Sequence, residues 1–502
     1  MLTIGRVLNG VFDDEVGWRP ATGAVKPVHV ANGLFRALCS EYWDIEGVVE
    51  FVAWQKYGKP IPERSFEALG ERRQDVFRAF SGNRARFERV RRYARGIVAA
   101  DRAVFPDAAK SALTIACREM ISRDDMDKGV GTFAAALLGD PGTGGSLAAA
   151  ILRALTVETP QDPVTALVWP LISSHTRREW KPAVRTLALE RRHATDTVAA
   201  LRTAADCLAN HELRQGNRLR TLQRGTLFTC LAIHSHAQGI AAGGEIRNRV
   251  PGLLAIVGGK NDSVAAVSER ALDLMYSQFE SWLATQLSKR LETGQSLDPH
   301  HRPAEPPLEV PTNLSQARRI LDRILTAGRE PRQPDDTVKA ARQANLDYHI
   351  QQLGRDNLFN ALASALVSSY VTEYESGGPR PFLQGLGRKS GLLYPPYQGR
   401  SREKRIRPTV AMLDVLVRAT VQQGQIVPFD EFLQSLWRTF GLIVGVRRGE
   451  PSDEELLARH GLRIDPDQLH DNAEALIDQL AYMGLAKRLA DGITYVGDGN
   501  AA

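Results

Sequence analysis

The sequence predicts a mainly α-helical, multi-domain protein that ends in a winged-helix-like module. Apolar residues recur at steps of three and four along most of the chain, and strand-like alternation is scarce. Near the C-terminus, three helical patterns precede a single hairpin signal. With 502 residues, the chain is long enough for about three domains.

The clearest helical pattern covers residues 264–291. Its apolar residues form one stripe of a helix: Val264, Val267, Ala271, Leu274, Met275, Phe279, Trp282, Leu283 and Leu287. A shorter helix is expected from Leu314 onward, with Asn313 as its N-cap and Gly328 as its stop. The same periodicity predicts helices over residues 87–98, 112–121, 147–155, 195–208, 226–237 and 356–374.

Two segments divide the chain. Residues 296–313 hold five prolines, which oppose both helix and central strand and predict an extended linker. Residues 377–408 are rich in basic, aromatic, Gly and Pro residues and predict a flexible arm. The predicted units are an N-terminal helical body of one or two subdomains (1–295), the linker (296–313), a helical middle (314–376), the basic arm (377–408) and the winged-helix-like domain (409–502).

The arm carries a charge as large as that of the whole chain. Its eight basic residues are Arg380, Arg388, Lys389, Arg400, Arg402, Lys404, Arg405 and Arg407. With Glu403 as the one acid among them, the local charge is eight minus one, or +7, compared with +6 for the full sequence. Tyr394 and Tyr397 lie between these cations. Because cations and aromatic rings together suit phosphate contacts and base stacking, the arm is predicted to bind DNA.

The C-terminal module has the element order of a winged helix-turn-helix. Helices are predicted over residues 409–421, 428–440 and 466–483, and an insertion at 445–461 separates the last two. The sequence then reads GLAKRLADGITYV, in which Asp491-Gly492 is a strong hairpin signal.

The third of these helices is poorly suited to reading DNA, although winged helices normally use it for that purpose. It carries or borders five acids, Asp465, Asp467, Asp471, Glu474 and Asp478, and no Arg or Lys lies between residues 465 and 483. Phosphates would repel this helix, so we expect it to contact protein. DNA contacts of the module are predicted for Lys487 and Arg488 in the hairpin.

Two Cys–His pairs are candidate zinc ligands. Cys207 and His211, like Cys230 and His234, are four residues apart on a predicted helix and so share one face. Two such helices packed together could present two thiolates and two imidazoles to zinc. The simpler interpretation is that each Cys is a small core residue and that the protein needs no cofactor.

No catalytic motif is complete. Residues 139–146, GDPGTGGS, resemble a phosphate-binding loop, but Gly145 stands where the loop needs Lys. Tyr394-Pro-Pro-Tyr397 lacks the polar first residue of the adenine methyltransferase motif. The sequence therefore favours a protein that is not an enzyme.

The chain is expected in the cytoplasm, with no membrane partner. Acids near the N-terminus interrupt the apolar run that a secretory signal requires. No stretch approaches the roughly 20 apolar residues that span a bilayer. Four scattered cysteines do not form a disulfide pattern.

Two segments, RVPGLLAIVGGKNDSVAAVSERALDLMYSQFESWL (249–283) and EFLQSLWRTFGLIVG (431–445), resemble uncharacterised helical proteins of bacterial anti-phage gene clusters, of the methylation-associated defence type. The resemblance implies a non-catalytic component of a multi-gene antiviral system, with DNA and the other subunits of that system as partners. It transfers no site residue. Two alternatives stay open: a protein scaffold without nucleic-acid contact, and a divergent metal-dependent nuclease around the two Cys–His pairs.

Overall fold

The structure is a computed structural model. It describes residues 2–43, 117–156, 177–181 and 195–498, except for 125, 140–141, 143, 216, 257–262, 295–309, 327–331, 374–377, 397–403 and 491; residues 83, 85, 86, 89, 166 and 169 are also described. Over these residues the protein is mainly helical, as predicted.

The first half of the described chain contains short N-terminal helices and two long ones. Its elements are α1 (Ile4–Val7), α2 (Asn9–Val11), the π-helix η1 (Phe12–Val16), α3 (Pro27–Cys39), β1 (Glu41–Trp43), the 3-10 helix η2 (Arg118–Met120), α8 (Val130–Leu137), α9 (Leu147–Leu155), β2 (Arg177–Glu179), α12 (Thr195–Gln215), α13 (Arg218–Ala241), the 3-10 helix η3 (Ile246–Asn248) and β3 (Gly252–Leu253).

The second half begins with the longest described helix. Its elements are α14 (Ser263–Glu292), α15 (Leu314–Arg323), α16 (Asp336–Leu353), the 3-10 helix η4 (Arg355–Asn357), α17 (Leu358–Glu373), α18 (Pro379–Lys389), β4 (Leu393–Tyr394), β5 (Arg405–Ile406), α19 (Val410–Thr420), β6 (Ile426–Pro428), α20 (Phe429–Phe440), β7 (Leu442–Ile443), α21 (Asp453–Arg459), α22 (Pro466–Tyr482), β8 (Ala486–Arg488) and β9 (Thr494–Gly497).

Most of the predicted helices that fall on described residues are present. Those over 147–155, 195–208, 226–237 and 264–291 correspond to α9, α12, α13 and α14, and 356–374 corresponds to α17. The predicted N-cap is also confirmed, since Asn313 Oδ1 accepts a hydrogen bond from the Gln316 amide. Helix α15 ends at Arg323, before the predicted stop at Gly328, which lies outside the described residues. Ser146 Oγ caps α9 in the same way by accepting from the Ala149 amide.

One predicted helix is not observed over its described residues. The prediction over 112–121 is wrong for its described part, where residues 118–120 form a 3-10 turn. The cause is tertiary, because the Ile121 carbonyl accepts a hydrogen bond from the Trp43 amide and the chain is extended there. Apart from residue 89, the helix expected over 87–98 lies outside the described residues, as does most of the proline-rich linker.

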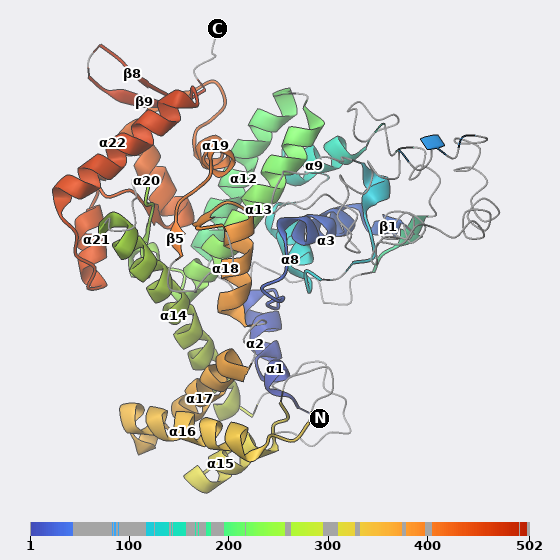
Figure 1. Ribbon diagram of the computed structural model, residues 1–502, viewed down its shortest axis with the longest axis vertical. Coiled ribbons are helices and arrows are strands. Elements are labelled where there is room, and N and C mark those ends of the chain that lie inside the picture. Colours follow the sequence, from blue (N-terminus) through green and yellow to red (C-terminus); the bar gives the residue numbers. More distant parts are fainter. Residues whose placement is uncertain are drawn as a thin grey trace.

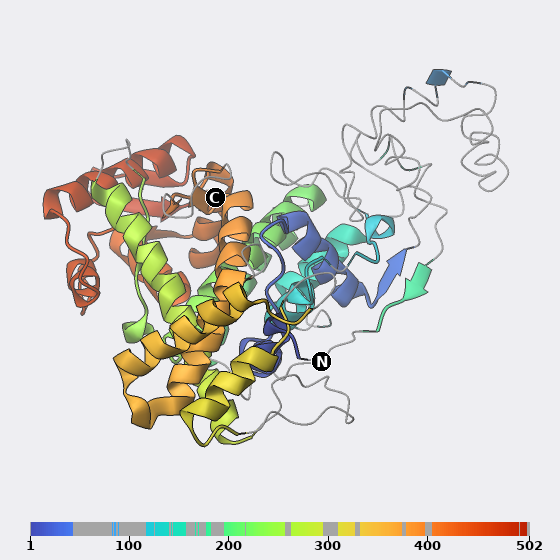
Figure 2. The ribbon, with the colours of Figure 1, turned by 60° about the horizontal axis from the view of Figure 1, so that its bottom comes forward.

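Helix α14 connects the upper and lower parts of the molecule (Figure 1). Its N-terminal part packs near β3, β5 and α22, and its other end packs against α17. The lower lobe consists of α15, α16 and α17, which come forward in Figure 2. Arg342 fastens this lobe by binding both carboxylate oxygens of Glu373 and the carbonyls of Leu321 and Ile324.

One apolar core runs through all of these parts. It includes residues from Ile4 to Val496 and therefore crosses the predicted unit boundaries. Trp18 lies at its centre, where its ring meets Phe12, Phe279 of α14 and Phe382 of α18 at centroid distances of 6.4, 6.3 and 5.2 Å. The N-terminal segment also joins the lower lobe, since the Ile4 amide donates to the Leu325 carbonyl.

The C-terminal elements form a three-helix module with one small sheet. The sheet has the strand order β6-β9-β8, with both pairings antiparallel. The three predicted helices of this region and its predicted hairpin are present as α19, α20, α22 and β8–β9. The predicted insertion contains α21, which begins with a capping box formed by Ser452 and Glu455.

A buried extended segment, residues 252–256, joins this module to the body. Its β3 strand pairs in parallel with β7, and the Ala255 amide donates to the carbonyl of Ile406 in β5. Asn472 of α22 completes the junction: its Nδ2 donates to the carbonyls of Leu254 and Val444, and its Oδ1 accepts from the Ile256 amide. The side chain of Asn472 is fully buried, so these contacts are sheltered from water.

Replacing Asn472 by Ala should destabilise the protein by about 3 kcal/mol, because three buried backbone groups lose their partner. Urea unfolding measures the change. Asp471→Ala, at the exposed neighbouring position, is the matched control and should change the free energy of unfolding by less than about 0.5 kcal/mol. Equal stabilities of the two variants would show that the junction does not depend on this amide.

Candidate nucleic-acid interface

The prediction of a flexible arm is wrong for the described residues of the arm, most of which are folded against the core. Its first part is helix α18, and its second part contributes the antiparallel hairpin β4–β5. The reason is apolar: Phe382, Leu383 and Leu386 of α18 are buried in the core, and Leu393 of β4 is buried opposite Ile406 of β5. Their burial outweighs the Gly, Pro and charge content from which flexibility was inferred.

Arg380 is bound to the body by acids of α14. Its guanidinium group contacts the carboxylates of Asp273 and Glu280 and the hydroxyl of Ser277. It also lies 5.6 Å from the ring centroid of Tyr276. Although burial lowers the pKa of Arg380, the carboxylates of Glu280 and Asp273 outweigh it and leave this pKa raised. This cation is therefore neutralised within the fold.

Three further basic residues of the arm also serve internal contacts. Lys389 Nζ donates to the carbonyls of Gly23 and Val25 at 3.0 and 2.8 Å, and buried Lys404 donates to the Pro395 carbonyl at 3.0 Å. Buried Arg405 pairs with Glu269 of α14 at 3.4 Å. Their positive charges tie the arm to the rest of the chain.

The remaining predicted arm residues are less constrained or are not described. Arg388 and Arg407 are half-buried and have no ion pair with a described carboxylate. Arg407 lies 5.2 Å from the ring centroid of Tyr394, which Arg405 also approaches at 5.1 Å. Two guanidinium groups therefore already make cation–π contacts with this ring. The other three predicted residues, Tyr397, Arg400 and Arg402, lie outside the described residues.

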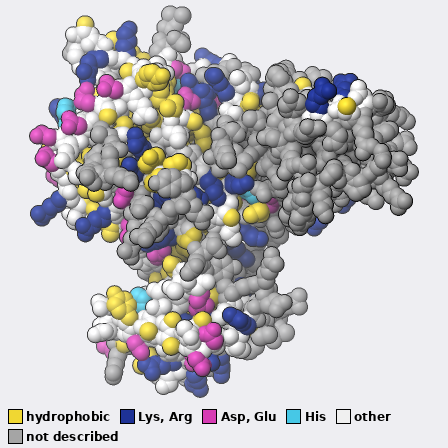
Figure 3. Space-filling model, viewed as in Figure 1, with side chains coloured by type: hydrophobic (Ala, Val, Ile, Leu, Met, Phe, Trp, Pro, Cys, Tyr) yellow, Lys and Arg dark blue, Asp and Glu magenta, His cyan; other side chains and the backbone are white. Residues whose placement is uncertain are grey.

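The hairpin β8–β9 presents one exposed cation without an ion pair to a described acid. Lys487 is exposed, and exposed Arg488 pairs with Glu474 of α22 at 2.8 Å. Along α22 the acids Asp467, Asp471 and Asp478 are exposed, as predicted. Basic and acidic side chains are interspersed over the C-terminal elements on the face shown in Figure 3.

The four candidate zinc ligands do not converge. His211 Nε2 donates to the Val421 carbonyl at 2.8 Å, whereas His234 Nε2 donates to the Leu383 carbonyl at 2.7 Å on a different element. Burial raises the pKa of Cys207 to about 12 and also raises that of Cys230, which favours neutral thiols. Within the described part of the chain, no group of three or more His, Cys, Asp and Glu side chains is placed to hold a metal ion.

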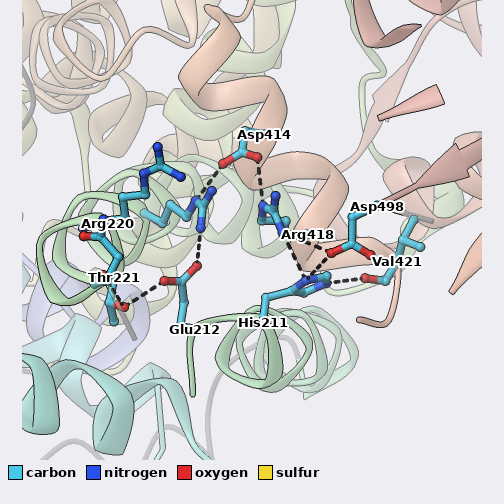
Figure 4. A network of polar contacts seen from close by, with 10 residues as sticks. His211, Glu212, Arg220, Thr221, Asp414, Arg418, Val421 and Asp498 are labelled. Carbon is cyan, nitrogen blue, oxygen red and sulfur yellow. Dashed lines mark hydrogen bonds and ion pairs between the residues drawn. The ribbon is translucent and has the colours of Figure 1, made fainter. Parts of the chain in front are cut away.

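His211 instead belongs to a polar network that joins α12 and α13 to α19 (Figure 4). Its Nδ1 accepts from Arg418 Nη1 at 3.2 Å and lies 3.3 Å from the Asp498 carboxylate. Arg418 also binds Asp414, one helical turn earlier on α19. Burial is the main reason that the pKa of His211 is lowered, so the neutral ring is favoured.

Arg224 forms the centre of this network. It donates to Glu212 of α12 at 2.8 Å and to Asp414 of α19 at 2.6 Å. The Glu212 side chain is completely buried and also accepts from the Thr221 hydroxyl at 2.8 Å. Since a buried carboxylate needs a cation, the network fixes the C-terminal module against the helical body.

Sequence reasoning missed Glu212, Arg224, Asp414 and Asn472. All four lie within helices, and the contacting pairs Arg224–Asp414 and Asn472–Leu254 are 190 and 218 residues apart. No local pattern could have identified them.

No protein-family model matches the sequence, and no curated protein matches it either. The described helices include none with the length and apolar character needed to cross a membrane.

Replacing Arg224 by Met should destabilise the protein by about 3–5 kcal/mol, because buried Glu212 loses its cation. Urea unfolding measures this effect. Arg318→Met is the matched control, since Arg318 pairs with Asp347 on the surface and such pairs contribute at most about 1 kcal/mol. Adding Glu212→Leu to Arg224→Met should recover much of the lost stability; no recovery would contradict the explanation.

His234 should make stability depend on pH. Burial lowers its pKa from 6.5 to about 4, so the unfolded chain takes up this proton more readily than the native protein does. The resulting stabilisation, of order 3 kcal/mol, is present above pH 6.5 and is lost as the pH falls toward 4.

His234→Gln tests this dependence, because the amide can still donate to the Leu383 carbonyl but does not titrate. Between pH 7 and 4.5 the variant should lose less stability than the wild type in urea unfolding. His470→Gln, at an exposed position of α22, is the control. Parallel pH profiles for the wild type and His234→Gln would contradict the assignment.

Proposed function

We propose that the protein is a non-catalytic component of a bacterial antiviral defence system, which docks partner subunits and contacts DNA through its C-terminal half. The observation that carries this proposal is the arrangement of α19, β6, α20, α22, β8 and β9, with the strand order β6-β9-β8. Three helices, an early strand and a closing hairpin in this order support a winged-helix module, with α22 as its third helix and β8–β9 as its wing.

The third helix favours protein as its partner. Asn472 and Leu469 lie on its buried face, which packs into the body, while the exposed acids Asp467, Asp471 and Asp478 would be repelled by phosphates. Tyr482 at the end of the helix is 93% exposed and adds an aromatic contact to this surface. This face is the proposed docking site for other subunits of the system.

DNA contact is assigned to the cations that the fold leaves available. These are Lys487 on the wing and half-buried Arg388 and Arg407. Arg400 and Arg402, which lie outside the described residues, stay in the proposal on the evidence of the sequence alone. Arg380, Lys389, Lys404 and Arg405 are removed from the proposed interface because internal contacts occupy them. The proposal also places the protein in the cytoplasm, without membrane or cofactor.

A scaffold without nucleic-acid contact is the second candidate. It is favoured by one specific observation: the ion pairs of Arg380 and Arg405 with acids of α14 use up part of the charge that first suggested DNA binding. The antiviral role itself rests on the sequence resemblance. A zinc-dependent nuclease is not proposed, since His211 and His234 serve separate structural contacts.

The salt dependence of DNA binding separates the two candidates. The affinity of the wild-type protein for a short duplex should fall linearly with salt on a log–log plot. The paired substitution Arg400→Ala and Arg402→Ala, and separately Lys487→Ala, should reduce that slope by about 0.9 for each phosphate that the variant no longer neutralises. Fluorescence anisotropy over a series of salt concentrations measures the slopes.

Arg380→Ala is the matched control, because it removes the same charge from a residue held by Asp273 and Glu280. It should lower stability and leave the slope unchanged. If the wild-type protein does not bind DNA, or if the Arg400/Arg402 and Lys487 variants keep the wild-type slope, the scaffold is the better description. In that case, capture of neighbouring subunits should persist after nuclease treatment.

A further inference from the structure

Arg249 is a fully buried cation with very little compensation. It has no exposed surface, and its Nη2 donates to the hydroxyl of Thr197 in the first turn of α12. Its Nε and Nη1 have no hydrogen-bond partner. A guanidinium group carries five N–H groups, so at least the three on these two nitrogens lack an acceptor.

The other buried arginines of the described chain provide an internal comparison. Six of them, Arg36, Arg224, Arg290, Arg342, Arg405 and Arg447, each pair with a carboxylate. Arg249 alone in this set has no ion pair, and Asp196, the one acid that influences it, is exposed. The protein therefore compensates buried guanidinium groups elsewhere and leaves this one open.

An uncompensated buried charge costs several kcal/mol, which a bound anion would remove. We propose that Arg249 and Thr197 hold a small oxyanion, a phosphate group, between the start of α12 and the segment that leads into β3. The planar fork of Arg binds phosphate oxygens in pairs, and the Thr197 hydroxyl adds a donor. The first turn of a long helix also favours negative charge through its dipole.

The burial of the two side chains favours a small group. Arg249 and Thr197 are both completely buried, so neither a nucleic-acid chain nor a whole nucleotide can reach them without opening the fold. The phosphate would therefore be the free ion. This inference is independent of DNA binding at the C-terminal half.

Thermal unfolding of the full chain in phosphate and in chloride, at equal pH and ionic strength, tests the site. The wild-type protein should have the higher Tm in phosphate. Arg249→Met should lose this difference, and in chloride it should be at least as stable as the wild type, because an apolar side chain replaces an unpaired charge. Arg342→Met is the matched control: it breaks a carboxylate pair, so Tm should fall in both buffers while the phosphate effect remains.

Calorimetric titration with inorganic phosphate, and separately with AMP, gives a second measurement. Thr197→Val should weaken phosphate binding about tenfold, which keeps the test open if Arg249→Met does not fold. Binding of phosphate but not of AMP would support the buried site for the free ion, and binding of AMP as tightly as phosphate would contradict it. Equal wild-type Tm values in the two buffers, or an unchanged phosphate effect in Arg249→Met, would overturn the proposal.

Discussion

The burial of one extended segment, residues 252–256, constrains the rest of the structure. A strand inside a helical protein has no partner within its own sequence, yet its amides and carbonyls must be paired once water is excluded. Here β5, β7 and Asn472 supply those partners, and all of them come more than 130 residues later in the chain. Ser268 also joins this segment to Ile406, which lies 138 residues after Ser268. The C-terminal module is consequently part of the main core.

The same constraint explains why the arm is ordered over its described residues. The Ala255 amide has a hydrogen-bond acceptor only when the Ile406 carbonyl is in place, and the hairpin β4–β5 holds that carbonyl in position. The cations of the arm then lie against the body, where Arg405 and Arg380 form ion pairs with acids of α14. The basic residues are concentrated in the sequence, but in the structure some of them make internal contacts and others remain at the surface.

Arginine has a consistent role in this protein. Arg224, Arg342 and Arg447 each bind a buried or half-buried carboxylate and a second acceptor. Arg224 and Arg342 thereby join different helices, whereas Arg447 holds its own segment in place through Asp453 and Pro451. A planar group with five donors suits such junctions better than lysine does. Against this background, the isolation of Arg249 is informative, because it departs from a pattern that the same chain follows elsewhere.

Local sequence by itself determined helices α9, α12, α13, α14 and α17, the N-caps of α9 and α15, and the order of the C-terminal elements, but it did not identify α18. Periodicity fixes which face of residues 264–291 is apolar, and Asn313 and Ser146 cap their own helices, because these effects act within a few residues. Tertiary structure alone decided which charges are available. The ion pairs of Arg380 with α14 and the hydrogen bonds of Asn472 with residues 254 and 256 depend on groups at least 100 residues away. Composition could therefore locate the charge but could not tell a surface cation from a neutralised one.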